Sequence, residues 1–191
     1  MFRRPARATR SMRTPRSADV AVARAASDAT TTSANGIVVK ALDDDGLVGD
    51  PHRWERLFAA VLDAEDVAGP GEATLVFVDA VAISQLNQLH MGEDAPTDVL
   101  SFPIDGAESL HEGERRVVGD VVICPEVAAV NAPGHTGGLD DELALLICHG
   151  VLHLLGHDHA EPEDRQRMWR RERELLAQLW TPLGLDPWAT A

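Results

Sequence analysis

The amino-acid sequence predicts a single small α+β domain, with a mixed sheet of about four strands packed with helices. Segments of strand-like and helical apolar spacing are intermixed along the chain, without the strict alternation of strand and helix that builds an all-parallel sheet. The length of 191 residues suits one domain with some chain left over for a tail. No internal repeat divides the sequence.

The N-terminal segment differs in composition from the remainder. Residues 1–36 contain seven arginines and only two acids, Asp19 and Asp28, and they show no apolar periodicity. We expect a disordered tail or a start codon assigned too early. The alternative is an organellar transit peptide, because such peptides are rich in Arg and Ser and poor in acids. The predicted domain covers residues 37–185, and residues 186–191 form a short tail.

The charge is unevenly distributed between these parts. The whole chain carries a net charge of −14, and residues 1–36 carry +5, which leaves −19 on residues 37–191. A body this acidic repels phosphate backbones at long range. A nucleic-acid substrate must therefore be held by local contacts or be presented by a partner.

The predicted elements follow from spacing and from capping residues. Strands are expected at residues 37–42, 74–78, 99–102 and 117–123. Helices are expected after Asp50, from Asp79 to about His90, from about Leu139 to Leu155 and from about Pro162 to Trp180. A short helical turn is expected at Pro125–Val130, followed by a loop at Asn131–Gly138. Asp50 followed by Pro51 is typical of an N-cap with proline at the first helical position.

The segment HGVLHLLGHDH, residues 149–159, is the most informative part of the sequence. His149 and His153 are four residues apart, so on a helix they share one face with Cβ atoms about 5–6 Å apart. Gly156 can turn the chain at the end of that helix because glycine tolerates positive φ. This turn would bring His159 back toward the other two imidazoles.

Three imidazoles with a fourth position open to water are typical of a catalytic zinc site, whereas structural sites close all four positions with protein ligands. We therefore predict one zinc ion bound by His149, His153 and His159, although nickel or copper also accepts this ligand set. His157 is the rival third ligand. It is otherwise a candidate catalytic residue, as a proton-transfer group or as a group that orients a ligand.

The spacing H-x3-H-x5-H, with a glycine seven residues after the first histidine, matches the metzincin protease pattern H-E-x-x-H-x-x-G-x-x-H. In that pattern the Glu after the first histidine is the general base. Gly150 occupies this position here. Peptide hydrolysis by the usual route would therefore lack its base.

Several polar residues outside the histidine segment are candidates for structural or functional roles. Asp120 either orients a ligand histidine, as in carboxylate–histidine–zinc arrangements, or is a strand-end carboxylate in a turn. Glu142 is expected to be a helix-start acid that complements the helix dipole. The run Arg165–Arg173 alternates basic and acidic residues, which predicts a solvated helix face. Thr97 and Asp98 are expected to close a loop through side-chain-to-backbone bonds, and the alternative is direct contact with the substrate.

The histidine segment resembles the signature of the YbeY endoribonucleases, which are rRNA maturation factors. Other segments agree with this family in order and spacing: PTDVLSFP at 96–103, a GDI-type strand at 119–123 and an LN pair at 86–87, within a resemblance that covers about residues 37–185. One departure is at Met91, in a stretch where many members carry an arginine. An apolar Met91 cannot neutralise a phosphate.

The resemblance implies a zinc hydrolase that cleaves single-stranded RNA in the 3′-end maturation of 16S rRNA and in ribosome quality control. It also implies single-stranded rRNA and the small ribosomal subunit, or ribosome-associated proteins, as partners. Two alternatives are a metzincin-like metalloprotease and a non-catalytic zinc-containing ribosome-assembly factor.

The expected location is the cytoplasm, or an organelle if residues 1–36 are a transit peptide. Cys124 and Cys148 form no CxxC pair, which suits a reducing compartment. No apolar run approaches the roughly 18–20 residues that span a bilayer, so no membrane partner is expected.

Overall fold

A computed structural model describes residues 30–105 and 114–189 of the chain. The strands are β1 (Thr31–Thr32), β2 (Ile37–Leu42), β3 (Gly71–Phe77), β4 (Val99–Pro103) and β5 (Arg116–Ile123). The helices are α1 (Pro51–Ala64), α2 (Ala80–Met91), α3 (Pro125–His135), α4 (Leu139–Leu154) and α5 (Pro162–Leu179). The predicted α+β class is confirmed.

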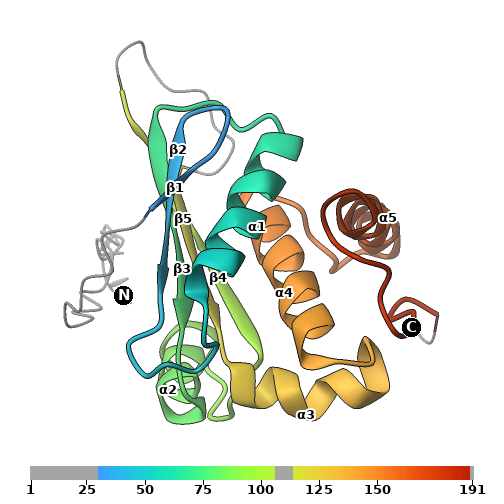
Figure 1. Cartoon of the computed structure of the whole chain (residues 1–191). Coiled ribbons are helices and arrows are strands. Elements are labelled where there is room, and N and C mark those ends of the chain that lie inside the picture. The colour runs from blue at the N-terminus through green and yellow to red at the C-terminus, as the bar shows by residue number, and fades with distance from the viewer. Residues whose placement is uncertain (1–29, 106–113, 190–191) are drawn as a thin grey trace, which may run out of the picture.

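The sheet has the strand order β1-β2-β3-β5-β4. Strands β2, β3 and β5 are parallel, and both edge strands, β1 and β4, are antiparallel to their neighbours. Helices α1 and α4 lie against one face of the sheet, and α5 lies on their outer side (Figure 1). The histidine-bearing helix α4 is therefore enclosed between the sheet and α5.

The sheet has five strands because a two-residue strand precedes the first one predicted. β1 lies inside the segment 1–36 that was expected to be a tail, and it pairs with β2. The turn after β1 is also tied to the domain, since the amides of Ala34 and Asn35 donate to the Asp63 carboxylate at 2.7 and 3.0 Å. The ordered domain thus begins before Ile37. The transit-peptide alternative concerns residues that lie largely outside those described.

The predicted helix starts are confirmed by their caps. The Asp50 side chain accepts a hydrogen bond from the His52 amide at 3.1 Å, and Asp79 accepts one from the Ala82 amide at 2.7 Å. These bonds satisfy backbone N–H groups that have no partner inside the first turn of a helix. Both caps precede the helices that cover the sheet.

Helix α3 is longer than predicted. It runs to His135, through residues 131–135 that were expected to belong to a loop, and it contains Pro133. Its buried residues Pro125, Ala128 and Ala132 recur at helical spacing, and the helix packs against α4. Because Pro133 lies near the end, its missing N–H costs only one bond of the last turn, and packing outweighs the local signal.

The two faces of the sheet are buried by different helices. The main core joins α1 and α4 to the sheet and includes the fully buried Phe58, Ile147 and Leu152. On the opposite face, Ile83 of α2 packs with Leu100 and Val122.

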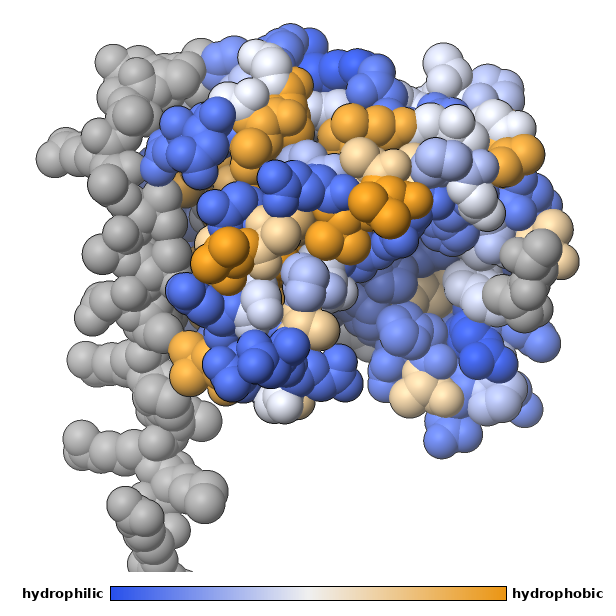
Figure 2. Space-filling view, turned by 90° about the horizontal axis from the view of Figure 1, so that it is seen from below, coloured by the Kyte–Doolittle hydropathy of each residue, from blue (hydrophilic) through white to orange (hydrophobic). Residues whose placement is uncertain are grey.

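The underside of the molecule, where α2 and α3 lie in Figure 1, is shown in Figure 2. Apolar side chains are gathered on part of this face and hydrophilic ones cover most of the remainder. The exposed large apolar residues of α2 and α3 are Val81, Leu89, Met91 and Val130. No helix within the described residues has the length and apolar character needed to cross a bilayer.

Candidate metal centre

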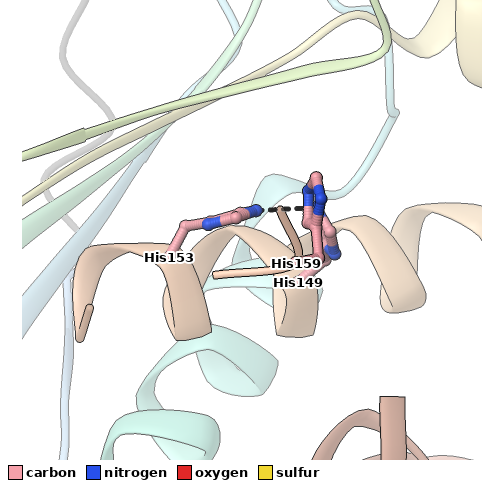
Figure 3. A group of neighbouring side chains, drawn as sticks. All are labelled: His149, His153 and His159. Atoms are coloured by element: carbon pink, nitrogen blue, oxygen red, sulfur yellow. Dashed lines mark hydrogen bonds between the residues drawn. The ribbon is translucent and has the colours of Figure 1, made fainter. Parts of the chain in front are cut away.

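Three histidines converge at the end of α4 and in the loop that follows it (Figure 3). His149 and His153 lie one turn apart on the same face of α4, with their Nε2 atoms 3.1 Å apart. His159 returns from the loop, and one nitrogen from each of the three rings lies within 4.8 Å of the others. The structure thus brings together the three predicted ligands.

The loop that carries His159 is shaped by two local features. Gly156 has φ of +88°, and the His157 amide donates to the Leu152 carbonyl at 3.0 Å, so the helix ends in a left-handed turn. The Asp158 carboxylate then accepts bonds from the amides of His159 and Ala160 at 2.7 and 3.2 Å. These bonds lower the pKa of Asp158 and hold the chain where His159 faces α4.

The Nδ1 atoms of the two helical ligands point away from the cluster toward acceptors. His149 Nδ1 lies 2.7 Å from Glu172 Oε1, and His153 Nδ1 lies 2.9 Å from the His157 carbonyl. A carbonyl and an ionised carboxylate can only accept, so each Nδ1 is assigned the proton. The two Nε2 atoms then face each other with lone pairs, an arrangement suited to a cation between them.

The dimensions of this pair fit a tetrahedral ion. Zinc–nitrogen bonds of about 2.0–2.1 Å place two tetrahedral ligands roughly 3.3 Å apart. The observed Nε2–Nε2 separation of 3.1 Å is close to this value. Three imidazoles would leave one position for water or substrate, as in catalytic sites. The donor type of all three residues and the spacing of the His149–His153 pair are therefore suited to one such ion.

Protonation of His153 is disfavoured in the metal-free site. Burial, followed by the nearby imidazoles of His149 and His159, lowers the pKa of His153 to about 4. Its ring is consequently neutral at physiological pH. A neutral imidazole is the form that ligates a metal.

Glu172 is a part of the site that the sequence analysis missed. It belongs to the run Arg165–Arg173, which was predicted to be solvated, yet its side chain is only 2% exposed. One oxygen accepts from His149, and the other accepts from the Trp188 indole N–H at 2.8 Å. The spacing along α5 could have predicted the burial of Glu172. It lies four residues after buried Met168 and three before buried Leu175, and therefore on the same face of the helix.

Trp188 also corrects the predicted C-terminal tail of residues 186–191. Its half-buried ring packs against the main core, and its indole N–H bonds to Glu172. The described chain to residue 189 is thus part of the domain, and this segment reaches the metal centre through one intervening side chain.

The two candidate catalytic residues are placed differently. His157 lies in the loop beside the cluster, and it supports His153 through its backbone carbonyl. Asp120 is not brought to the histidines. On β5, an added Cβ at Gly119 would meet Leu154 of α4, and Val121 contacts Gly150 of α4, so Asp120 faces the other side of the sheet. Glu172, rather than Asp120, is the carboxylate that orients a ligand histidine, His149.

Gly150 faces the sheet at a close approach. A Cβ at this position would lie 2.6 Å from Val121 Cγ1 and 3.3 Å from Ser101 Oγ. The Ser101 hydroxyl also donates to the Gly150 carbonyl at 3.1 Å. A glutamate, as in the metzincin pattern, has no room here, which agrees with the expected lack of that base.

A second buried carboxylate lies in the first turn of α4, where an acid complementing the helix dipole was expected. Glu142 is only 1% exposed. It accepts from the Thr136 hydroxyl at 2.7 Å, and His135 Nδ1 lies 2.8 Å from it. The loop-closing expectation for Asp98 is also confirmed, since Asp98 accepts from the Val99 amide at 2.9 Å.

The fold and the site define a small α+β protein with a three-histidine cluster suited to one metal ion. Residues 43–180 match the family model described as Endoribonuclease YbeY. The chain therefore belongs to the endoribonuclease YbeY family, a family of hydrolases, as its histidine segment indicated.

Individual relatives agree with this assignment. Endoribonuclease YbeY of Frankia casuarinae is 43% identical over 134 residues, which are 67% of this chain and 67% of the relative. That of Thermobifida fusca is 42% identical over 138 residues, 71% of this chain and 89% of the relative. The solution structure of TM1509 from Thermotoga maritima superposes with a TM-score of 0.51 at 25% identity, covering 75% of this chain and 89% of that one.

Proposed function

We propose that the protein is a zinc-dependent endoribonuclease that cleaves single-stranded RNA, acting in 16S rRNA 3′-end maturation and in ribosome quality control. Membership of the endoribonuclease YbeY family supports the reaction class. The observation that carries the metal dependence is the pair of Nε2 atoms facing each other at 3.1 Å while both Nδ1 atoms face acceptors.

In this proposal His149, His153 and His159 hold one zinc ion. When bound, the ion supplies Lewis acidity, either lowering the pKa of a water toward 7 or polarising a phosphoryl oxygen. Glu172 holds the His149 ring in the tautomer whose Nε2 is free to ligate. Asp158 fixes the turn that presents His159. His157 remains the candidate for proton transfer, and Asp120 receives no role at the metal.

The charge of the domain favours a docked substrate. Residues 37–191 carry −19, which opposes capture of free RNA at long range. We infer that the small ribosomal subunit, or a protein bound to it, presents the rRNA 3′ end. The proposed location is accordingly the cytoplasm, where ribosomes assemble, or an organelle if residues 1–36 direct the chain there.

The experiment compares a 16S rRNA 3′-end fragment offered as a single strand and as a duplex, with zinc-loaded protein and with small subunits added in a parallel series. We expect endonucleolytic products from the single strand and little from the duplex. Equal cleavage of both forms would contradict the strand specificity. Failure to cut either form, with subunits present and zinc bound, would overturn the nuclease proposal.

Met91 gives one observation in favour of the non-catalytic assembly factor. It is 58% exposed at the end of α2, and it supplies no positive charge where many members of the family carry arginine. Stable association of a zinc-loaded, non-cleaving protein with small subunits would support that function. The protease alternative needs a carboxylate from elsewhere in the fold beside the metal, because Gly150 leaves no room for the metzincin base.

A further inference from the structure

A second feature adjoins the metal centre. A pocket of about 240 Å³ lies between α4, α5 and the C-terminal segment. Its lining includes His149, Trp169, Trp188, His135, Glu142 and Asp98. His149 belongs both to this pocket and to the histidine cluster, so the two features share one side chain.

The carboxylates that line the pocket disfavour the binding of a phosphate. Asp98, Glu142 and Glu172 contribute carboxylates to its lining, and the last two are almost fully buried. An anion would be repelled there and would also lose its hydration. A carboxylate has about four lone-pair sites. Glu142 already has His135 and Thr136 as partners, and Asp98 already accepts from Thr97, Val99 and Asn131, so each can accept one further N–H donor. The pocket is therefore suited to a neutral group that carries N–H donors.

Two half-buried tryptophan side chains favour a planar occupant. Trp169 and Trp188 both line the pocket. Indole rings stack well on nucleobases, and aromatic side chains are the usual platforms for unpaired bases. The volume lies below the roughly 300–1,000 Å³ typical of sites for drug-sized ligands, so one ring system fits better than a longer segment.

Arginines lie on the same two rings, outside the pocket. The Arg165 guanidinium carbon lies 5.5 Å from the centroid of the Trp169 ring, and that of Arg173 lies 4.8 Å from Trp188. Neither arginine lines the pocket. Arg173 is also paired with Asp186 at 3.3 Å, in an exposed and therefore weak ion pair. This arrangement puts positive charge at the rim of an otherwise acidic site.

We propose that this pocket binds one unpaired nucleobase of the RNA, in the nucleotide beside the phosphodiester held at the metal centre. The base stacks against Trp169 and directs its exocyclic amino group toward Asp98 and Glu142, while Arg165 contacts the backbone outside. Adenine, cytosine and guanine carry such an amino group, and uracil does not. The inference rests on the proposed function and gives a reason for single-strand specificity, since a paired base cannot enter.

The experiment measures equilibrium binding of zinc-loaded full-length protein to single-stranded RNA hexamers of adenosine, cytidine or uridine, and to adenosine hexamers with one abasic position. We expect the uridine hexamer to bind more weakly. We also expect one abasic position to reduce affinity about tenfold, within the range for losing a stacked base. Equal affinity for all three hexamers, with no effect of an abasic site at any position, would overturn the inference.

Two pairs of variants make the test specific. Trp169→Ala should lose about tenfold in affinity and should no longer respond to the abasic position, whereas Trp169→Phe should retain most of the affinity. Arg165→Gln should reduce the slope of log affinity against log salt by about 0.7 and leave the base preference unchanged. Zinc content and circular dichroism check that each variant is folded. Binding of Trp169→Ala with wild-type affinity would overturn the inference.

The binding measurement does not depend on cleavage. Base-dependent binding through Trp169 in a protein that cuts no RNA would support the pocket and refute the proposed nuclease. If wild type cleaves RNA and Trp169→Ala cleaves it with an unchanged KM, the proposed role of the pocket in base binding is refuted and the proposed nuclease activity is not.

Discussion

The Nδ1 atom of His149 lies 2.7 Å from Oε1 of Glu172, and this contact joins α4 to α5 across 23 residues of sequence. The Glu172 side chain is only 2% exposed, and its second oxygen is taken by Trp188. A buried carboxylate with two partners fixes the ring of a metal ligand more tightly than solvent would. Two residues from separate parts of the chain, Glu172 and Trp188, therefore set the orientation of the His149 imidazole.

Replacing Glu172 by Gln should weaken zinc binding. The amide oxygen can still accept from Nδ1, but the loss of the negative charge makes His149 a poorer ligand, and such changes usually cost 10–100-fold in metal affinity. Competition with a chelator of known affinity measures the effect. Glu174→Gln is the matched control, because Glu174 is on the same helix, is exposed and contacts Arg171 rather than a histidine. Equal zinc affinity of the two variants would contradict the assigned role.

Replacing Trp188 by Phe should destabilise the domain. Phenylalanine keeps most of the ring packing but removes the N–H that bonds to Glu172 at 2.8 Å. Leaving a buried carboxylate oxygen without this partner costs about 1–3 kcal/mol. Urea unfolding of the zinc-free protein measures this free energy. An unchanged unfolding midpoint would show that the segment after Asp186 does not support the site.

Replacing Gly150 by Ala should also destabilise the domain. The new methyl group would lie 2.6 Å from Val121 Cγ1, so α4 must move away from β5, and overpacking of this kind costs about 1–3 kcal/mol. Gly134→Ala is the control, because an added Cβ there meets no atom within 4 Å. We expect that control to be neutral or slightly stabilising. Similar unfolding midpoints for the two variants would contradict the close packing of α4.

The stability of the zinc-free domain should depend on pH through His153. Its pKa is lowered to about 4 in the folded protein, whereas an unfolded histidine titrates near 6.5. Between these values the unfolded chain binds a proton that the folded chain does not. The His153 contribution to stability is therefore full above pH 6.5 and is lost as the pH falls toward 4.

Urea unfolding at pH 7 and pH 5, compared between wild type and His153→Gln, isolates this contribution. Glutamine does not titrate, so the variant should lose less stability on acidification than wild type does. An identical loss in both proteins would show that His153 is not held in its neutral form.

Much of the metal centre could be predicted because its signal is local. Helical spacing places His149 and His153 together, and Gly156 supplies the turn that returns His159. The caps at Asp50 and Asp79 are local for the same reason. Each of these features depends on residues within one or two turns of chain.

The parts that could not be predicted depend on tertiary contacts. Glu172 sits in a charged run and becomes a buried partner only because α5 packs against α4. Trp188 lies beyond the last helix, and its role depends on reaching Glu172. The position of Asp120 could not be predicted for a related reason. A one-residue change of position along β5 reverses the face of the sheet to which a side chain points, and the sequence does not fix that face.

The most direct test of the account determines zinc content and RNA cleavage together in wild type, His153→Ala and His157→Ala. We predict one zinc per chain in wild type and in His157→Ala, and loss of both zinc and cleavage in His153→Ala. His157→Ala keeps the backbone carbonyl that supports His153, so any fall in its rate would reflect the imidazole alone. Cleavage that persists after zinc is lost, or full zinc with no cleavage in wild type, would contradict the account.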